Sequence, residues 1–242
     1  MDGKDYFLND INDELFQKLL PVCAPNCMAT SFGRFEVIYS VYNNIKYIVQ
    51  NEIPGDVVEC GVWKGGLMQL AALTLLELGD TSRKIYLYDT FEGMPEPGVF
   101  DKDWNDNSPH SKWESLRWEN DASLGSRFGF GGSLEIVRSI MEETKYPSDN
   151  FVFVKGLVEE TIPAACPTQI ACLRLDTDWY SSTAHELEYL FPLLSVGGIL
   201  VIDDYGYYKG SRKATDEYIK KNNIRILLSR ISELGVREGI KQ

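Results

Sequence analysis

Four aspartates close two apolar runs in the second half of the chain. The stretch LRLDTDWYSST carries Asp176 and Asp178, and GGILVIDDYG, one helical segment later, carries Asp203 and Asp204. Apolar runs of this length, rich in Leu, Ile and Val, are typical of buried strands. Because neighbouring parallel strands end at the same edge of a sheet, we expect up to four carboxylates to converge within a few ångströms.

A convergence of carboxylates predicts a divalent cation. Without a cation the carboxylates would repel one another, and some would be protonated. Oxygen-only ligands favour Mg²⁺ or a similar hard ion. Such an ion could lower the pKa of an alcohol and orient it, while a nearby carboxylate took its proton. The residues leave open whether Asp176 or Asp178 is the base and which of them ligates, because the strand is ending there.

Two other enzyme classes have similar sequence motifs and remain as alternatives. Haloacid-dehalogenase phosphatases pair a D-x-D strand with a later D-D, but they need a lysine and a Thr or Ser site between the two. The gap here is one helical segment, AHELEYLFPLL, which has no lysine. Metal-dependent glycosyltransferases hold a nucleotide-sugar pyrophosphate with D-x-D, yet they lack a second acidic strand end one helix later. Both alternatives therefore fit less well than a metal site beside a cofactor.

A glycine turn and a further aspartate lie upstream of the acids. The first expected strand runs into ECGVWKGG, where glycines let the backbone approach a ligand and let the next helix N-terminus face it. The spacing differs from the dinucleotide motif G-x-G-x-x-G, which argues against NAD. Asp89 ends the second expected strand, where an acid can accept hydrogen bonds from ribose hydroxyls or cap the segment that follows. Together these features favour a nucleoside-containing cofactor.

Alternating strands and helices would position these residues. Strands are expected over 57–62, 84–90, 150–156, 170–177, 198–204, 224–230 and 236–241, and helices over 10–20, 34–51, 67–78, 134–144, 184–194 and 213–222. This alternation predicts an α/β fold with a mostly parallel sheet covered on both faces. Ligands of such sheets bind at the carboxyl ends of the strands.

Residues 92–132 interrupt the alternation. This segment is polar, contains Gly and Pro, and carries Trp104, Trp113 and Trp118. A connection this long in a compact domain is usually functional or disordered. We expect a lid that closes over a ligand. The whole chain, 1–242, is expected to be one domain, with residues 1–53 as an N-terminal helical cap.

The composition excludes some partners. A net charge of −12, from 36 acidic and 24 basic residues, argues against nucleic acid, which requires a clustered basic surface. No basic region followed by an apolar one opens the chain, and no apolar run approaches membrane-spanning length. Five cysteines, an odd number without a paired framework, suit a reducing compartment. We expect a cytoplasmic protein that binds no membrane.

The assembled motifs resemble the TylF-like (macrocin O-methyltransferase) family of S-adenosylmethionine- and metal-dependent sugar O-methyltransferases. The matching stretches are GDVVECGVWKGG, YLYDTFEGMPEP, VKGLVEETIP, LRLDTDWYSST and GGILVIDDYGYYKGSRKATDEY. The resemblance implies a class I methyltransferase fold, Rossmann-like, with a seven-stranded, mostly parallel sheet. It also implies methyl transfer from S-adenosylmethionine, with Mg²⁺, to a sugar hydroxyl such as that of a deoxysugar on an antibiotic or related glycoside.

The resemblance further implies roles for individual residues. The methionine end and ribose of the cofactor would be bound by Glu59, Gly61, Trp63 and Asp89, and the adenine would be bordered by Ser133, Gly156 and Val158. Mg²⁺ would be bound by Asp176, Asp203 and Asp204, and Asp178 would be the candidate base. A non-catalytic module that binds S-adenosylmethionine is the remaining alternative.

Two questions stay open beside these roles. The cations Lys64 and Arg174 could offset local acid or contact the cofactor carboxylate, but we expect each to be solvated at the surface or on a strand face. Aromatic residues in the N-terminal helices and the lid could cover the site or form a surface between copies, so a homodimer or higher oligomer is a further expectation.

Overall fold

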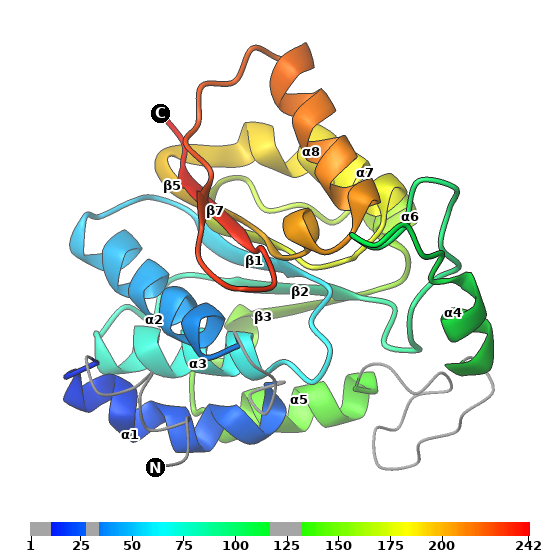
Figure 1. Ribbon diagram of the computed structural model, residues 1–242. Helices are drawn as coiled ribbons and strands as arrows, with labels where there is room; N and C mark the ends of the chain where they lie inside the picture. Colours follow the sequence, from blue (N-terminus) through cyan, green and yellow to red (C-terminus); the bar gives the residue numbers. More distant parts are fainter. Residues whose placement is uncertain (1–10, 28–33, 117–131) are drawn as a thin grey trace.

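The fold is built on one sheet. A computed structural model describes residues 11–27, 34–116 and 132–242. Within these residues, seven strands form one sheet in the order β3-β2-β1-β4-β5-β7-β6 (Figure 1). The strands are β1 (Asp56–Cys60), β2 (Ile85–Asp89), β3 (Phe151–Lys155), β4 (Ile170–Leu175), β5 (Leu194–Ile202), β6 (Ser229–Arg230) and β7 (Arg237–Ile240). Strands β1 to β5 are parallel, and β7 is antiparallel to β5 and β6. The predicted seven-stranded, mostly parallel α/β sheet is confirmed.

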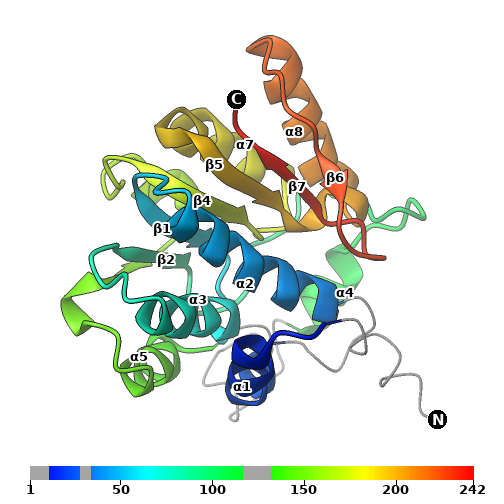
Figure 2. The same ribbon diagram turned by 90° about the vertical axis from the view of Figure 1, so that its left-hand side faces the viewer.

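Helices cover both faces of the sheet (Figures 1 and 2). One face packs against α2 (Arg34–Gln50), α3 (Gly66–Glu77) and α5 (Leu134–Glu143), with α1 (Glu14–Cys23) outside α3. The other face packs against α6 (Val158–Thr161), α7 (Tyr180–Leu190) and α8 (Lys209–Lys221). The remaining helical segments are α4 (His110–Leu116), η1 (Ala24–Asn26), η2 (Ser148–Asn150), η3 (Phe191–Leu193) and η4 (Asp203–Gly206). In the described ranges, no helix has both the length and the apolar character needed to cross a membrane.

Alternating side chains of the central strands build the two halves of the core. Val57 and Ile199 face the layer of α2 and α3, whereas Val58 and Leu200 face the layer of α7. Successive residues of a strand point to opposite faces, so a strand that is buried on both sides must be apolar at consecutive positions. Because β1 to β5 run parallel, the polar residues that follow them lie together at one edge of the sheet.

The ends of the chain differ in part from the expectation. Helices α1 and α2 precede β1 as predicted, and residues 1–10 and 28–33 of the expected cap lie outside the described residues. The strand expected over 224–230 is wrong in extent, since only Ser229 and Arg230 pair with β7. The preceding Ile224, Ile226 and Leu228 instead pack against the core on the α7 and α8 side.

Candidate active site

One cavity of about 420 Å³ lies at the carboxyl ends of the five parallel strands β1 to β5. It is lined by most of the site residues predicted from the sequence, namely Gly61, Trp63, Asp89, Gly156, Val158, Asp176, Asp178, Asp203 and Asp204. These residues lie at or just after the ends of five different strands. The sheet therefore brings the glycine turn, Asp89 and the four aspartates that follow β4 and β5 to one site.

Three aspartates form what we call the carboxylate cup. Asp176 follows β4, and Asp203 and Asp204 follow β5 at the start of η4. One carboxylate oxygen of each lies within 4.8 Å of those of the other two. Asp178 lies beside the cup, because its backbone N–H donates to Oδ2 of Asp204 at 3.0 Å. An oxygen-only set at this spacing has the chemistry that a hard divalent cation requires.

The electrostatics of the cup also fit a cation. Asp203 and Asp204 are 4% and 6% exposed, so the carboxylates are removed from water. Burial, followed by the charges of Asp178, Asp176 and Asp203, raises the pKa of Asp204 well above its ordinary value. A divalent cation at the same place would reverse this effect by favouring the ionised form.

Arg174 is buried behind the cup, which corrects the expectation that it is solvated. The side chain is 1% exposed, and Nη1 donates to Oδ2 of Asp176 at 2.7 Å and to Oε1 of Glu59 at 3.1 Å. Nη2 donates to Oδ1 of Asp203. A buried guanidinium is tolerated here because three carboxylates surround it.

The turn after β4 contains a residue with a left-handed backbone conformation, and a buried glutamate contacts this turn. Asp178 has φ +64°, the left-handed region, which few residues other than Gly and Asn adopt readily. Both carboxylate oxygens of Glu186, 3.0 and 3.1 Å away, contact Oγ1 of the preceding Thr177. Glu186 is fully buried on α7, and this burial raises its pKa well above the usual value. Glu186 is not among the residues predicted from the sequence, although its spacing of four from the apolar Leu190 indicates a buried helix face.

The glycine turn after β1 lets two strand ends approach closely. Gly61 has φ +82°, and a Cβ there would overlap the carbonyl oxygen of Asp176. The Asp176 backbone N–H also donates to the Cys60 carbonyl at 2.8 Å. Gly61 therefore allows β1 and β4 to end side by side, which brings the glycine turn and the cup to the same cavity.

Asp89 organises the glycine turn. Its Oδ2 accepts from the backbone N–H groups of Val62 at 2.8 Å and Trp63 at 3.2 Å. Its Oδ1 accepts from the Phe91 N–H at 2.7 Å, so the local capping role considered from the sequence is also present. Burial raises the pKa of Asp89, and these backbone bonds oppose that shift. Asp89 lines the cavity, and its contact with a ribose stays a prediction.

Replacing Asp89 by alanine is expected to weaken cofactor binding at least tenfold and to lower the melting temperature. The reason is that each backbone hydrogen bond to an ionised carboxylate contributes about 1.5–3 kcal/mol to stability, which is lost when the carboxylate is removed. Titration calorimetry with S-adenosylhomocysteine measures the first effect, and thermal unfolding the second. An intermediate loss is expected for Asp89→Asn, which keeps one acceptor oxygen. Unchanged affinity in Asp89→Ala would contradict the assignment.

Glu59 and Ser133 are placed away from the cavity wall. Glu59 is 2% exposed on β1, and burial raises its pKa to about 8 even though the Arg174 charge opposes the shift. Ser133 caps α5, where its Oγ accepts from the Ile136 N–H at 3.4 Å. Neither is among the described residues that line the cavity. Their cofactor contacts stay predictions.

The first part of the expected lid is attached to the site. Trp179, the residue after Asp178, donates from its indole Nε1 to the Pro95 carbonyl at 2.9 Å. Buried Asp101 accepts from the Tyr180 N–H at 2.7 Å and so caps α7 from outside the helix. These bonds fix residues 95–101 against the turn that carries Asp178.

The three tryptophans of this segment have different places. Trp113 lines the cavity, and its Nε1 donates to the Met94 carbonyl at 2.9 Å. Trp104 is 63% exposed, and Trp118 lies outside the described residues. One tryptophan thus supports a cover for the cavity, and closure of residues 92–132 stays a prediction.

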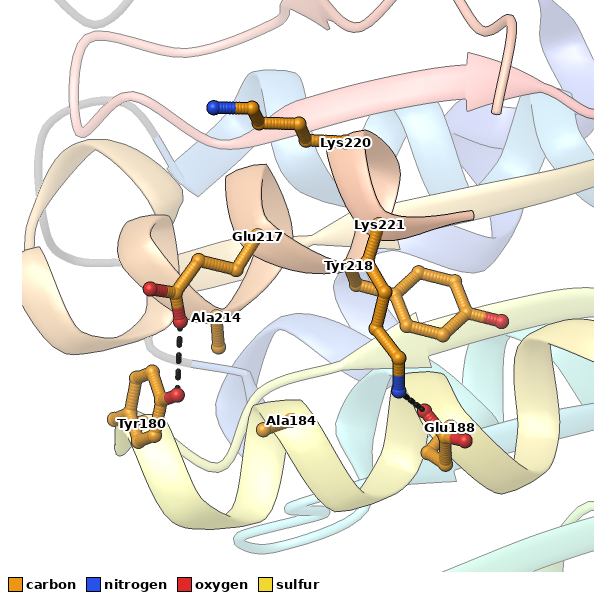
Figure 3. A pocket seen from close by; sticks show the side chains of 8 residues that line it. All are labelled: Tyr180, Ala184, Glu188, Ala214, Glu217, Tyr218, Lys220 and Lys221. Carbon is orange, nitrogen blue, oxygen red and sulfur yellow. Dashed lines mark hydrogen bonds and ion pairs between the residues drawn. The ribbon is translucent and has the colours of Figure 1, made fainter. Parts of the chain in front are cut away.

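A second hollow, of about 590 Å³, lies between α7 and α8 (Figure 3). Its dashed contacts join Tyr180 to Glu217 at 2.8 Å and Lys221 to Glu188 at 3.2 Å. The lining residues are Tyr180, Ala184, Glu188, Ala214, Glu217, Tyr218, Lys220 and Lys221. None of the nominated site residues borders this hollow, so its greater volume does not make it the site of chemistry.

The chain is similar to O-methyltransferases in three comparisons. The family model for macrocin O-methyltransferase (TylF) matches residues 22–237. The 8-demethyl-8-(2,3-dimethoxy-α-L-rhamnosyl)-tetracenomycin-C 4′-O-methyltransferase of Streptomyces olivaceus is 34% identical over 198 residues, covering 80% of this chain and 70% of that enzyme. The mycinamicin III 3″-O-methyltransferase of Micromonospora griseorubida is 30% identical over 198 residues, covering 80% and 73%. The solved structure of the O-methyltransferase NovP has a TM-score of 0.70 at 27% identity, covering 86% of this chain and 80% of NovP.

Proposed function

The chain belongs to the TylF (macrocin O-methyltransferase) family, and from this membership we propose that it methylates a sugar hydroxyl of a natural product or related glycoside. It is an S-adenosylmethionine-dependent O-methyltransferase with a class I fold. The sugar acceptor is inferred from relatives whose names specify one, such as the rhamnosyl-tetracenomycin enzyme. The observation that carries the proposal is that the glycine turn and the carboxylate cup line one cavity.

The β1 to β3 side of the cavity is assigned to the cofactor. Gly61 and Trp63 would contact the methionine end, Asp89 the ribose, and Gly156 and Val158 the adenine. Support comes from their places on the cavity wall. A glycine turn lets the backbone approach a ligand closely, and the N-terminus of α3 favours a polar ligand at this position.

The β4 to β5 side is assigned to the metal and the acceptor. The cup fits Mg²⁺ or a similar ion, because its donors are three close, buried carboxylates. When bound, the ion would orient the acceptor hydroxyl and lower its pKa. Asp178, beside the cup, would take the hydroxyl proton. Methyl transfer is an in-line displacement, so the cavity must also align the two substrates.

Several further features are proposed with this function. Residues 1–242 would act as one catalytic domain, with 1–53 as a cap and 92–132 as a lid over the acceptor. We place the enzyme in the cytoplasm, because five cysteines, an odd number without a paired framework in the sequence, suit a reducing compartment. A homodimer or higher oligomer is also proposed, with exposed Phe100 and Trp104 as candidate contacts.

Metal removal tests the chemistry directly. Purified protein should bind S-adenosylhomocysteine in calorimetry and transfer a labelled methyl group to a deoxysugar glycoside. EDTA should lower the rate about a hundredfold or more, because the ion supplies several kcal/mol of transition-state stabilisation. Excess Mg²⁺ should restore it. Absence of cofactor binding would overturn the function, and full activity in EDTA would overturn the metal.

A further inference from the structure

A buried arginine links the central strands directly behind the carboxylate cup. Arg174 lies near the end of β4 and stands opposite Glu59 of β1 in the parallel register. Leu173 and Leu175 face the α7 layer, so Arg174 and Asp176 share the other face of β4. The guanidinium is therefore aimed along the sheet toward the cup.

The guanidinium contacts two of the three cup residues. Nη1 donates to Asp176 at 2.7 Å, and Nη2 donates to Asp203 on the neighbouring loop. On its other side, Nη1 donates to Glu59 at 3.1 Å. One rigid group thus joins the ends of β1, β4 and β5. Each carboxylate has several acceptor lone pairs, so a bond to Arg174 is compatible with ligation of a cation.

The cluster is not arranged for stability alone. In the described part of the chain, Nε of Arg174 and Oε2 of Glu59 are buried without a hydrogen-bond partner. Buried unpaired polar atoms destabilise a fold, and apolar residues of similar volume are often as stabilising as a buried ion pair. Stability alone therefore does not explain why these charges lie here.

We propose that Arg174 is a positioning residue, which holds Asp176 and Asp203 at the spacing that a divalent cation needs, while Glu59 anchors the guanidinium from β1. The inference rests on the proposed metal site. A planar guanidinium can bond two carboxylates in fixed directions, whereas a lysine ammonium is a point charge on a flexible chain. The geometry of the fork, and not only its charge, is the property that the cup uses.

Direct metal binding separates geometry from charge. Mn²⁺ titration followed by electron paramagnetic resonance, with S-adenosylhomocysteine bound, should show Arg174→Lys weakening metal affinity roughly 10- to 100-fold, as for other groups that orient ligands. The charge is kept in this variant, and only the fork is lost. Affinity for S-adenosylhomocysteine should change little, because Arg174 acts on the cup.

A second variant decides the question if Arg174→Lys fails to fold. The double variant Glu59→Gln/Arg174→Gln removes the guanidinium together with its partner on β1. Because burial raises the pKa of Glu59 to about 8, the variant loses mainly positive charge near neutral pH, and that loss alone would favour cation binding. It also avoids leaving a lone buried charge. A glutamine amide cannot bond Asp176 and Asp203 together, so we expect a similar loss of Mn²⁺ affinity.

Arg83 offers a matched control. It is a largely buried arginine bonded to Asp80 at 2.7 Å and to the carbonyls of Ile53 and Gly55, at the opposite end of the strands. Arg83→Lys should lower thermal stability and leave Mn²⁺ affinity unchanged. Wild-type Mn²⁺ affinity in either Arg174 variant that folds would overturn this inference and leave the proposed metal site standing. A wild-type protein that binds no divalent ion would overturn the proposed metal site, and this inference with it.

Discussion

Replacing Asp204 by asparagine is expected to remove nearly all activity while stabilising the metal-free protein at neutral pH. Asp204 is one of the three carboxylates of the cup, and an amide binds a hard cation much more weakly. Loss of the ion should lower kcat/KM roughly 10²- to 10⁴-fold, or about 3–5.5 kcal/mol. Affinity for S-adenosylhomocysteine should be retained, since the glycine turn is untouched.

The gain in stability follows from the raised pKa of Asp204. In the folded, metal-free protein, burial and then the charges of Asp178, Asp176 and Asp203 raise this pKa well above its ordinary value. The folded state therefore binds more protons than the unfolded state between the two pKa values. The free energy of unfolding falls as pH rises from the ordinary carboxyl pKa through the raised one. The asparagine side chain does not titrate, so the free energy of unfolding of the variant does not decrease for this reason as pH rises.

Thermal unfolding in EDTA over a pH series measures this effect. The melting temperature of Asp204→Asn minus that of the wild type should be near zero below about pH 4 and increase above it. Saturating Mg²⁺ should stabilise only the wild type, because binding to the folded state raises its stability. Asp149→Asn, with the same charge change at an exposed position before β3, should behave as wild type. An Asp204→Asn protein that stays active would refute the metal site.

The position of the acids could be predicted because it depends on local patterns. Asp176 and Asp203 each follow an apolar strand directly, and one helix separates those strands. A single helical crossover usually joins neighbouring parallel strands, so the convergence follows from the order of elements. Gly61 could be singled out for a similar reason, since a glycine between a buried strand and a helix signals a close approach.

The partners of these acids could not be predicted because they depend on register. Arg174 and Glu59 are 115 residues apart, and only the pairing of β4 with β1 shows that their charges meet. An arginine within an apolar strand otherwise suggests an exposed face. The left-handed backbone of Asp178 and the contact of Thr177 with Glu186 of α7 could not be predicted either, because no local sequence motif indicates them.

Replacing Asp178 by asparagine is expected to lower kcat roughly 10²- to 10⁴-fold while leaving metal and cofactor binding intact, because loss of a general base has an effect of this size. Asp178 stands beside the cup without belonging to its three close carboxylates, which supports a role in taking the proton. Asparagine is well suited to test this. It tolerates the left-handed conformation seen at φ +64°, so the turn and its N–H bond to Asp204 should persist.

Two comparisons make the result of Asp178→Asn specific. Asp149 is an exposed aspartate before β3, outside the site and the lid, and Asp149→Asn should keep wild-type activity. Asp176→Asn should instead weaken Mn²⁺ binding, since Asp176 belongs to the cup. If Asp178→Asn lost Mn²⁺ affinity and Asp176→Asn kept it, the two roles would be exchanged. Asp176 would then be the base. Either of two neighbouring carboxylates on one turn can bind the cation while the other accepts the proton. The separate effects of the two variants on metal affinity and on kcat distinguish these roles.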